Sequence, residues 1–150
     1  MSRLSSAAFA PRPYSRQDQV QYLVLLLVAS AVLVIARLLP PSPRGVGTHQ
    51  QLGLPPCFFL KLTGLPCPSC GLTTSFAHAA KLHFYEALLA QPFGLLAFCL
   101  TALLIPLSVY LIYAQMPWAR LIRARHANIV VYTLLALYLL GWIYKIIAMS

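Results

Sequence analysis

Three cysteines stand close together in the first half of the chain, and their thiols offer more chemistry than any other side chains present. Cys67 and Cys70 are separated by two residues in the stretch GLPCPSCG, and Cys57 precedes Cys67 by ten residues. Pro68 stiffens the turn between the pair, and Gly71 permits a tight backbone directly after it. This Cys-Pro-x-Cys-Gly motif predicts a knuckle in which both sulfurs point at one centre.

Metal binding is one chemistry that this spacing suits. Zinc takes four ligands in a tetrahedral arrangement, and its usual protein ligands are cysteine and histidine. The three cysteines supply three ligands, and His78, about two helical turns after Cys70, is the candidate for the fourth. His49 and His83 are alternatives to it. The signature is a weak one, because the second cysteine pair of a zinc ribbon is missing.

Two other uses of the thiols remain open. A disulfide from Cys57 to Cys67 or Cys70 would staple a loop that lacks its own core, by ~2–4 kcal/mol, if the loop faces an oxidising compartment. Alternatively, Cys67 and Cys70 form the kind of dithiol that thioredoxin-like enzymes use, with Cys57 as the resolving partner. A helix that begins after Cys70 would lower the pKa of its thiol. However, the sequence has no alternating strand–helix pattern for a thioredoxin fold. Cys99 lies within an apolar run and is interpreted as a packing residue.

The sequence contains few side chains that could act as general acids or bases. Asp18 and Glu86 are the only two acids in 150 residues, and we interpret His83 and Glu86 as a surface pair on one helix. There is no Ser/His/Asp set, no phosphate-binding loop and no carboxylate pair for a metal. We therefore expect a non-enzymatic accessory or scaffold subunit with a structural cysteine knuckle, closed by zinc or a disulfide. A membrane thiol–disulfide oxidoreductase is the alternative.

The elements that position these cysteines are expected to be membrane helices. The chain is 60% hydrophobic and 9% charged, whereas charged residues make up about 25% of soluble domains. Its net charge is +9, but the cations flank apolar runs instead of clustering on a polar face, which argues against nucleic acid as a partner. The expected partners are the lipid bilayer and other membrane subunits.

Three apolar runs are long enough to cross a bilayer, namely residues 20–39, 92–113 and 129–147. At ~1.5 Å per residue, each run reaches about 30 Å, which is the thickness of the hydrocarbon core. Pro106 lies inside the second run and should kink that helix. The fold class predicted from these runs is an all-α membrane protein with three transmembrane helices.

Residues near the span ends suggest how the helices sit in the bilayer. Tyr22 is interpreted as an interface anchor, and the stem of Lys145 can extend so that its charge reaches the interface. Residues 1–19 are expected to form a flexible cytoplasmic tail. Residues 20–150 are expected to form one membrane domain.

The loop over residues 40–91, between the first two spans, carries the three cysteines. Its first part is too rich in proline and glycine for a span. From Leu72 onward, apolar residues recur every three to four positions, which predicts an amphipathic helix, bent near Lys81. Thr73 or Thr74 would cap its N-terminus. We expect this helix to lie at the interface or against the bundle.

The distribution of arginine predicts the orientation. The short loop after the second span holds Arg120, Arg123 and Arg125, whereas the long loop 40–91 spreads three cations over its length. Short cytoplasmic loops carry an excess of Lys and Arg. We therefore expect a multi-pass protein of the bacterial inner membrane, with its N-terminus in the cytoplasm and the cysteine loop outside.

The cysteine block also resembles a known family. The stretch CFFLKLTGLPCPSCGLTTSF, followed by EALLAQPFG, is similar to DUF2752, a family of small bacterial membrane proteins of unknown function. The resemblance covers residues 56–94 and implies a multi-span membrane protein with a Cys-rich first loop, but no reaction. The positions that match the family pattern are Cys57, Cys67, Cys70, Gly71, Thr73 and Pro92. The chain departs from that pattern at Phe58 (usually Pro), Thr74 (commonly Arg), Leu82-His83 (Gly-Asp) and Gln91 (Asn).

Overall fold

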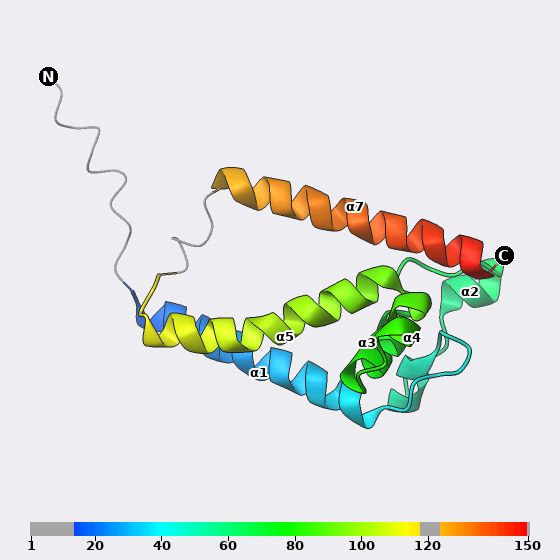
Figure 1. Cartoon of the computed structure of the whole chain (residues 1–150), viewed down its shortest axis with the longest axis horizontal. Coiled ribbons are helices and arrows are strands. Elements are labelled where there is room, and N and C mark those ends of the chain that lie inside the picture. Colours follow the sequence, from blue (N-terminus) through cyan, green and yellow to red (C-terminus); the bar gives the residue numbers. More distant parts are fainter. Residues whose placement is uncertain (1–13, 118–123, 150) are drawn as a thin grey trace, which may run out of the picture.

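The chain forms three long helices and a group of short ones (Figure 1). The computed structural model describes residues 14–117 and 124–149, and in these ranges helices are joined by turns and loops without a β-strand. Three described helices are long and apolar enough to cross a membrane. They are α1 (Arg16–Leu38), α5 (Pro92–Tyr113) and, within α7 (Ala124–Met149), residues Asn128–Met149. The predicted fold class is confirmed.

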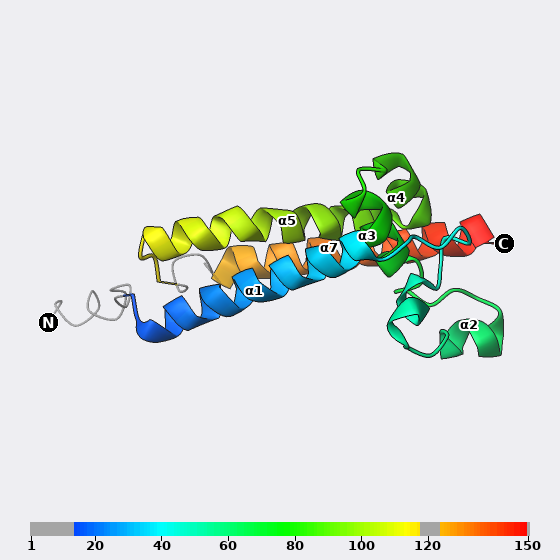
Figure 2. The same cartoon turned by 90° about the horizontal axis from the view of Figure 1, so that it is seen from below.

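The order of the helices gathers the cysteine-bearing segment at one end of the molecule. Helices α1 and α7 run in the same direction and α5 runs in the opposite one (Figures 1 and 2). The loop between α1 and α5 therefore meets the C-terminal turns of α7, and we call this region the loop end (residues 39–91 and the last turns of α7). It contains η2 (Thr48–Leu52), α2 (Phe58–Thr63), α3 (Leu72–Ala80) and α4 (Phe84–Ala90). The predicted tail up to residue 13, and loop residues 118–123 with two of its three arginines, lie outside the described residues.

Helix α1 begins at Arg16, before the apolar run, because its N-terminus is capped. Asp18 accepts a hydrogen bond from the Ser15 backbone N–H at 2.9 Å, and the Ser15 hydroxyl accepts one from the Asp18 amide. Tyr22 is fully buried and donates to the Met116 carbonyl at 3.0 Å. Its side chain therefore joins the start of α1 to the turn after α5, instead of anchoring α1 in a lipid interface.

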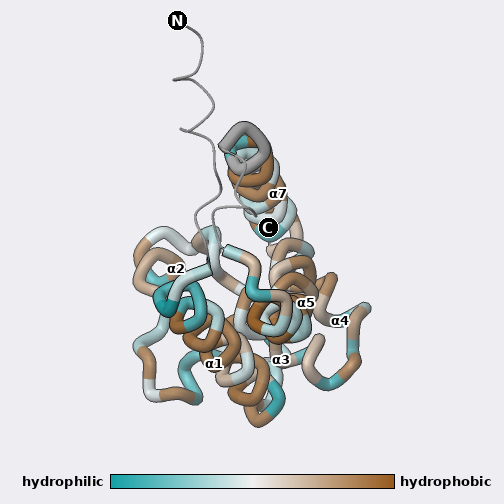
Figure 3. Tube along the Cα trace, turned by 90° about the vertical axis from the view of Figure 1, so that its left-hand side faces the viewer, coloured by the Kyte–Doolittle hydropathy of each residue, from teal (hydrophilic) through white to brown (hydrophobic). Residues whose placement is uncertain are grey.

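Helices α1 and α5 are the most closely packed of the three long helices. Small side chains such as Ala29 and Ala36 are buried on α1, and Ser108 is buried on α5, which suits close packing of helices. Gly94, at the start of α5, packs against Ser75 of α3, where a Cβ would lie 2.6 Å from the Ser75 Cβ. Helix α7 approaches the others near the loop end and diverges from them toward its own N-terminus (Figure 1). Hydrophobic residues run along all three helices (Figure 3), and many large ones are exposed, which indicates a membrane-embedded protein.

The helix predicted from Leu72 onward is two helices, α3 and α4. Leu82 adopts a φ of 66°, a left-handed conformation that an α-helix of L-residues cannot contain. The bend expected near Lys81 is therefore a complete break. The Ser75 hydroxyl on α3 donates to the carbonyl of Ala87 on α4 at 2.8 Å, so the two helices are fastened side by side before α5 begins.

Candidate metal centre

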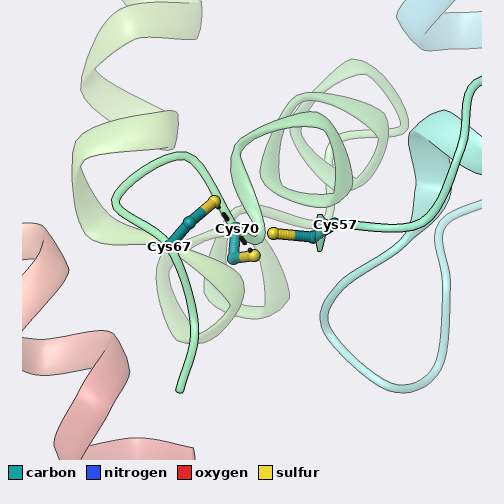
Figure 4. A group of neighbouring side chains, drawn as sticks. All are labelled: Cys57, Cys67 and Cys70. Atoms are coloured by element: carbon teal, nitrogen blue, oxygen red, sulfur yellow. Dashed lines mark hydrogen bonds between the residues drawn. The ribbon is translucent and has the colours of Figure 1, made fainter. Parts of the chain in front are cut away.

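The sulfurs of Cys57, Cys67 and Cys70 converge, as Figure 4 shows, and all three lie within 4.8 Å of one another. The sulfurs of Cys67 and Cys70 are 3.3 Å apart and form a thiol–thiol hydrogen bond. A disulfide requires about 2.05 Å, so these cysteines are present as free thiols. The predicted convergence of the cluster is confirmed.

The spacing of the sulfurs suits a tetrahedral metal ion. Zinc binds cysteine sulfur at about 2.3 Å, so tetrahedral angles would hold the sulfurs about 3.8 Å apart. The 3.3 Å between the Cys67 and Cys70 sulfurs is somewhat shorter than this value, and no two of the three sulfurs are more than 4.8 Å apart. Small side-chain rotations would bring the three thiolates to equal distances from one ion.

Local backbone structure places each thiol. Cys57 is the residue before the first turn of α2. The Cys70 backbone N–H donates to the Cys67 carbonyl at 2.9 Å, which closes the turn over Pro68. Gly71 follows with a φ of 91° and starts α3. The knuckle expected from the motif is thus a hydrogen-bonded turn between α2 and α3.

One face of α7 supports this knuckle. Residues Tyr138, Trp142 and Lys145 are spaced by four and three positions, so they lie on the same side of the helix. The Trp142 indole N–H donates to the Pro66 carbonyl at 2.9 Å, and the Tyr138 hydroxyl is hydrogen-bonded to the Ser69 hydroxyl at 3.1 Å. The third long helix therefore holds the backbone on both sides of Cys67.

Lys145 extends into the loop end, although its position near a span terminus favoured an exposed ammonium. The side chain is 4% exposed, and its Nζ donates to the carbonyls of Ala90 at 2.9 Å and Gly45 at 3.2 Å. Its stem passes Gly71, where a Cβ would lie 3.3 Å from the Lys145 Cε. A buried cation therefore lies beside the residue that follows Cys70, where it favours negative charge on the cluster.

Two residues at which the chain departs from the DUF2752 pattern have clear structural roles. The hydroxyls of Thr74 and Thr48 are hydrogen-bonded at 2.8 Å, which ties η2 to α3. Gln91 is fully buried and donates its side-chain N–H to the Pro68 carbonyl at 3.1 Å. Polar side chains at these positions therefore hold the knuckle in place. The sequence favours Thr73 or Thr74 as the cap of α3, but Gly71 occupies that position.

The three thiols differ in their electrostatic surroundings. The backbone amide of Leu60, in the first turn of α2, stabilises a thiolate on Cys57 and lowers its pKa; burial opposes this effect, and hydrogen bonds with the other two cysteines add to it. Burial raises the pKa of Cys70 to about 12, and the hydrogen bonds with Cys67 and Cys57 act in the same direction. In the metal-free cluster, Cys57 is thus the more readily ionised of these two.

This difference predicts the order of alkylation in metal-free protein. At neutral pH we expect iodoacetamide to modify Cys57 well before Cys70, because the thiolate is the reacting species and Cys70 is also buried. Timed quenching followed by mass spectrometry of the peptides would measure both rates. Equal rates, or faster modification of Cys70, would contradict the assignment. Zinc added beforehand should slow both reactions.

His78, the predicted fourth ligand, is not brought to the cysteines. It lies in the last turn of α3, six residues after Leu72 and therefore about 9 Å farther along the helix axis. Its ring lies 6.2 Å from that of His83, and burial lowers the pKa of His78. Among the described residues, the ligand atoms that cluster with the sulfurs come from the three cysteines alone. His49, one of the two alternatives, lines the same pocket as Cys57 and Cys70.

Comparison with known proteins finds a family that is similar to the segment with the cysteine centre. No curated protein and no solved structure matches this chain. Residues 57–105 match DUF2752, described as a protein of unknown function. The match begins at Cys57 and extends through the knuckle, α3 and α4 into α5, so it spans the segment that forms the centre. The resemblance of the cysteine block to DUF2752 is thus confirmed over residues 57–105.

Proposed function

We propose that this membrane protein binds one zinc ion through Cys57, Cys67 and Cys70, and that the ion fastens the loop end together. The observation that carries this proposal is the approach of three sulfurs to within 4.8 Å of one another. Thiolates this close repel one another unless a cation lies between them. Sulfur ligands select soft or borderline metals such as zinc over magnesium or calcium.

The need for a fastening is clearest at α2. This helix has six residues and buries none of them, and Phe58 and Leu62 are 75% and 71% exposed. Apolar contacts therefore do little to hold α2 against the bundle. A metal bond from Cys57 to the turn that holds Cys67 and Cys70 would supply the missing attachment. This arrangement supports a structural role for the metal, in an accessory or scaffold subunit.

Thiol–disulfide exchange is a second candidate function for the same cysteines. The 3.3 Å separation of the Cys67 and Cys70 sulfurs favours it, because a small movement would permit an S–S bond. In such a reaction the protein disulfide would accept two electrons and two protons from a substrate dithiol, which would leave as a disulfide.

An elemental and mass analysis separates the two functions. Protein purified in detergent without chelator should contain about one zinc per chain and, after the metal is removed, four free thiols, since the sequence has four cysteines. Two results together would refute the metal site and favour exchange. The purified protein would contain no zinc, and its mass would be lower by two hydrogens, as one disulfide requires.

We also infer that the loop end lies outside the cytoplasm. The arrangement of α1, α5 and α7 puts the start of α1 and the end of α5 at the same end of the molecule (Figure 1), and the arginines of the following loop favour a cytoplasmic location there. A membrane-impermeant thiol reagent applied to intact cells after chelation should therefore label Cys57. Labelling of Cys57 only after the cells are opened would show that the loop end faces the cytoplasm, which would contradict the inferred orientation.

A further inference from the structure

A pocket of about 300 Å³ opens beside the cysteine centre. Cys57 and Cys70 form part of its wall, so two of the three proposed ligands face it. The basic side chains in the same wall belong to Arg44, His49 and Lys61. The volume is at the lower end of the range of ligand sites, about 300–1,000 Å³. It is therefore suited to a small molecule or a head group.

The charges around this pocket lack an acidic partner. The chain has two acids, Asp18 and Glu86, and neither is among the residues that line the pocket. Three thiolates and one zinc ion would carry a net charge of −1. Arg44 and Lys61 in the pocket wall carry +2 together. The site therefore retains positive charge after zinc binds, and an anion would complete it.

We propose that this pocket binds a phosphate-type oxyanion, which also takes the fourth coordination position of the metal. The inference rests on the proposed zinc site. Three protein ligands plus one open position is the pattern of zinc sites that accept an exogenous ligand. Arg44 offers a planar guanidinium that matches two phosphate oxygens, and Lys61 adds a point charge. The phosphate belongs either to a free anion or to a lipid head group, and the experiment distinguishes these sources.

His49 is the competing fourth ligand, because it lines the same pocket. Its ring nitrogens do not belong to the cluster of ligand atoms formed by the three sulfurs. It lies on η2, whose first residue, Thr48, is fully buried and hydrogen-bonded to Thr74. A shift of η2 toward the metal would strain that bond. The geometry therefore favours an external ligand over closure by His49.

Replacing zinc with cobalt allows metal binding and anion binding to be measured separately in one absorption spectrum. Co²⁺ bound by thiolates gives charge-transfer absorption, and its ligand-field bands report changes at the fourth position. Full-length protein in detergent would be loaded with Co²⁺ and titrated with inorganic phosphate, and a parallel sample would be placed in vesicles with and without phosphatidylglycerol. We expect thiolate–cobalt absorption at once and a saturable band shift with phosphate. A shift produced by phosphatidylglycerol vesicles, but not by free phosphate, would assign the ligand to lipid.

Variants locate the anion. Arg44→Gln and Lys61→Gln should each weaken the phosphate-induced shift by about tenfold, because each removes a charge-assisted contact. Lys81→Gln removes a lysine of the same loop that is not in the pocket wall, and should leave the titration unchanged. Absence of thiolate–cobalt absorption would refute the zinc site itself. Normal cobalt binding without any response to phosphate or lipid, or loss of the phosphate-free spectrum in His49→Ala, would overturn the anion proposal alone.

Discussion

Replacing Cys70 with serine should release the metal and leave the loop end loosely held. A serine hydroxyl stays protonated at neutral pH and is a poor zinc ligand, whereas a cysteine thiolate binds the ion strongly. Disturbing groups that merely support metal ligands already costs about 10–100-fold in affinity, so losing a ligand should cost more. The expected zinc content falls from about one per chain to nearly none after dialysis against a weak chelator.

The same variant should expose the segment around α2 to protease. Since α2 buries none of its own residues, the metal bond at Cys57 is its principal attachment in our proposal. Limited proteolysis between Gly53 and Leu65, followed by mass spectrometry, would measure this change. The three spans should remain uncut, because each is a continuous helix long and apolar enough to lie within the membrane.

Cys99→Ser is the matched control for this experiment. Cys99 is exposed on α5 and is not part of the sulfur cluster. The substitution therefore makes the same change, sulfur to oxygen, at a position away from the centre. It should retain the zinc content and the proteolysis pattern of the unmodified protein. If Cys70→Ser retained zinc as fully as Cys99→Ser does, the three-cysteine site would have to be abandoned.

The long helices follow from local sequence because their requirements are local. Lipid demands a continuous apolar helix of about 20 residues, and proline suits the first turn of a helix. These two rules reproduce the bounds of α5, Pro92–Tyr113. Hydropathy alone places the start of the first span at Val20, whereas α1 begins at Arg16. The capping pair Ser15 and Asp18 was a readable signal for the earlier start.

The centre itself divides into a predictable part and an unpredictable part. The turn at Cys67 and Cys70 is coded by adjacent residues, and a motif of that kind can be read from sequence. The role of Lys145 cannot, because its partners Gly45 and Ala90 are 100 and 55 residues away in the chain. A lysine near the end of an apolar run is expected to reach toward water. Only the folded loop end supplies buried carbonyls that hold it instead.

The position of the histidines relative to the cysteines also depends on contacts between distant parts of the chain. Helical spacing places His78 on α3 correctly, but distance along the helix then carries it away from Cys70. His49, by contrast, comes near the cysteines because the Thr48–Thr74 hydrogen bond folds η2 back onto α3. That contact joins residues 26 positions apart, and no local sequence pattern predicts it.

Gly71→Ala should strongly destabilise the loop end. Gly71 has a φ of 91°, a conformation that costs an L-residue roughly 1–2 kcal/mol. A Cβ there would also lie 2.7 Å from the Ala90 carbonyl oxygen and 3.0 Å from that of Gly45. These are the two oxygens that bind Lys145. Relieving the overlap must therefore move either the lysine anchor or the neighbouring Cys70.

Gly64→Ala separates backbone strain from this crowding. Gly64 has a similar left-handed φ of 72°, but a Cβ there meets no atom within 4 Å. Backbone strain should lower the free energy of unfolding of both variants by roughly 1–2 kcal/mol. In Gly71→Ala, displacement of packed atoms should lower it by at least about as much again. Thermal unfolding in detergent, with zinc release recorded in the same samples, would measure both effects. Because Cys70 is bonded directly to Gly71, metal release should shift to lower temperature in Gly71→Ala and little in Gly64→Ala. Equal shifts in the two variants would mean that the Ala90–Lys145–Gly71 contact does not hold the cysteine centre in place.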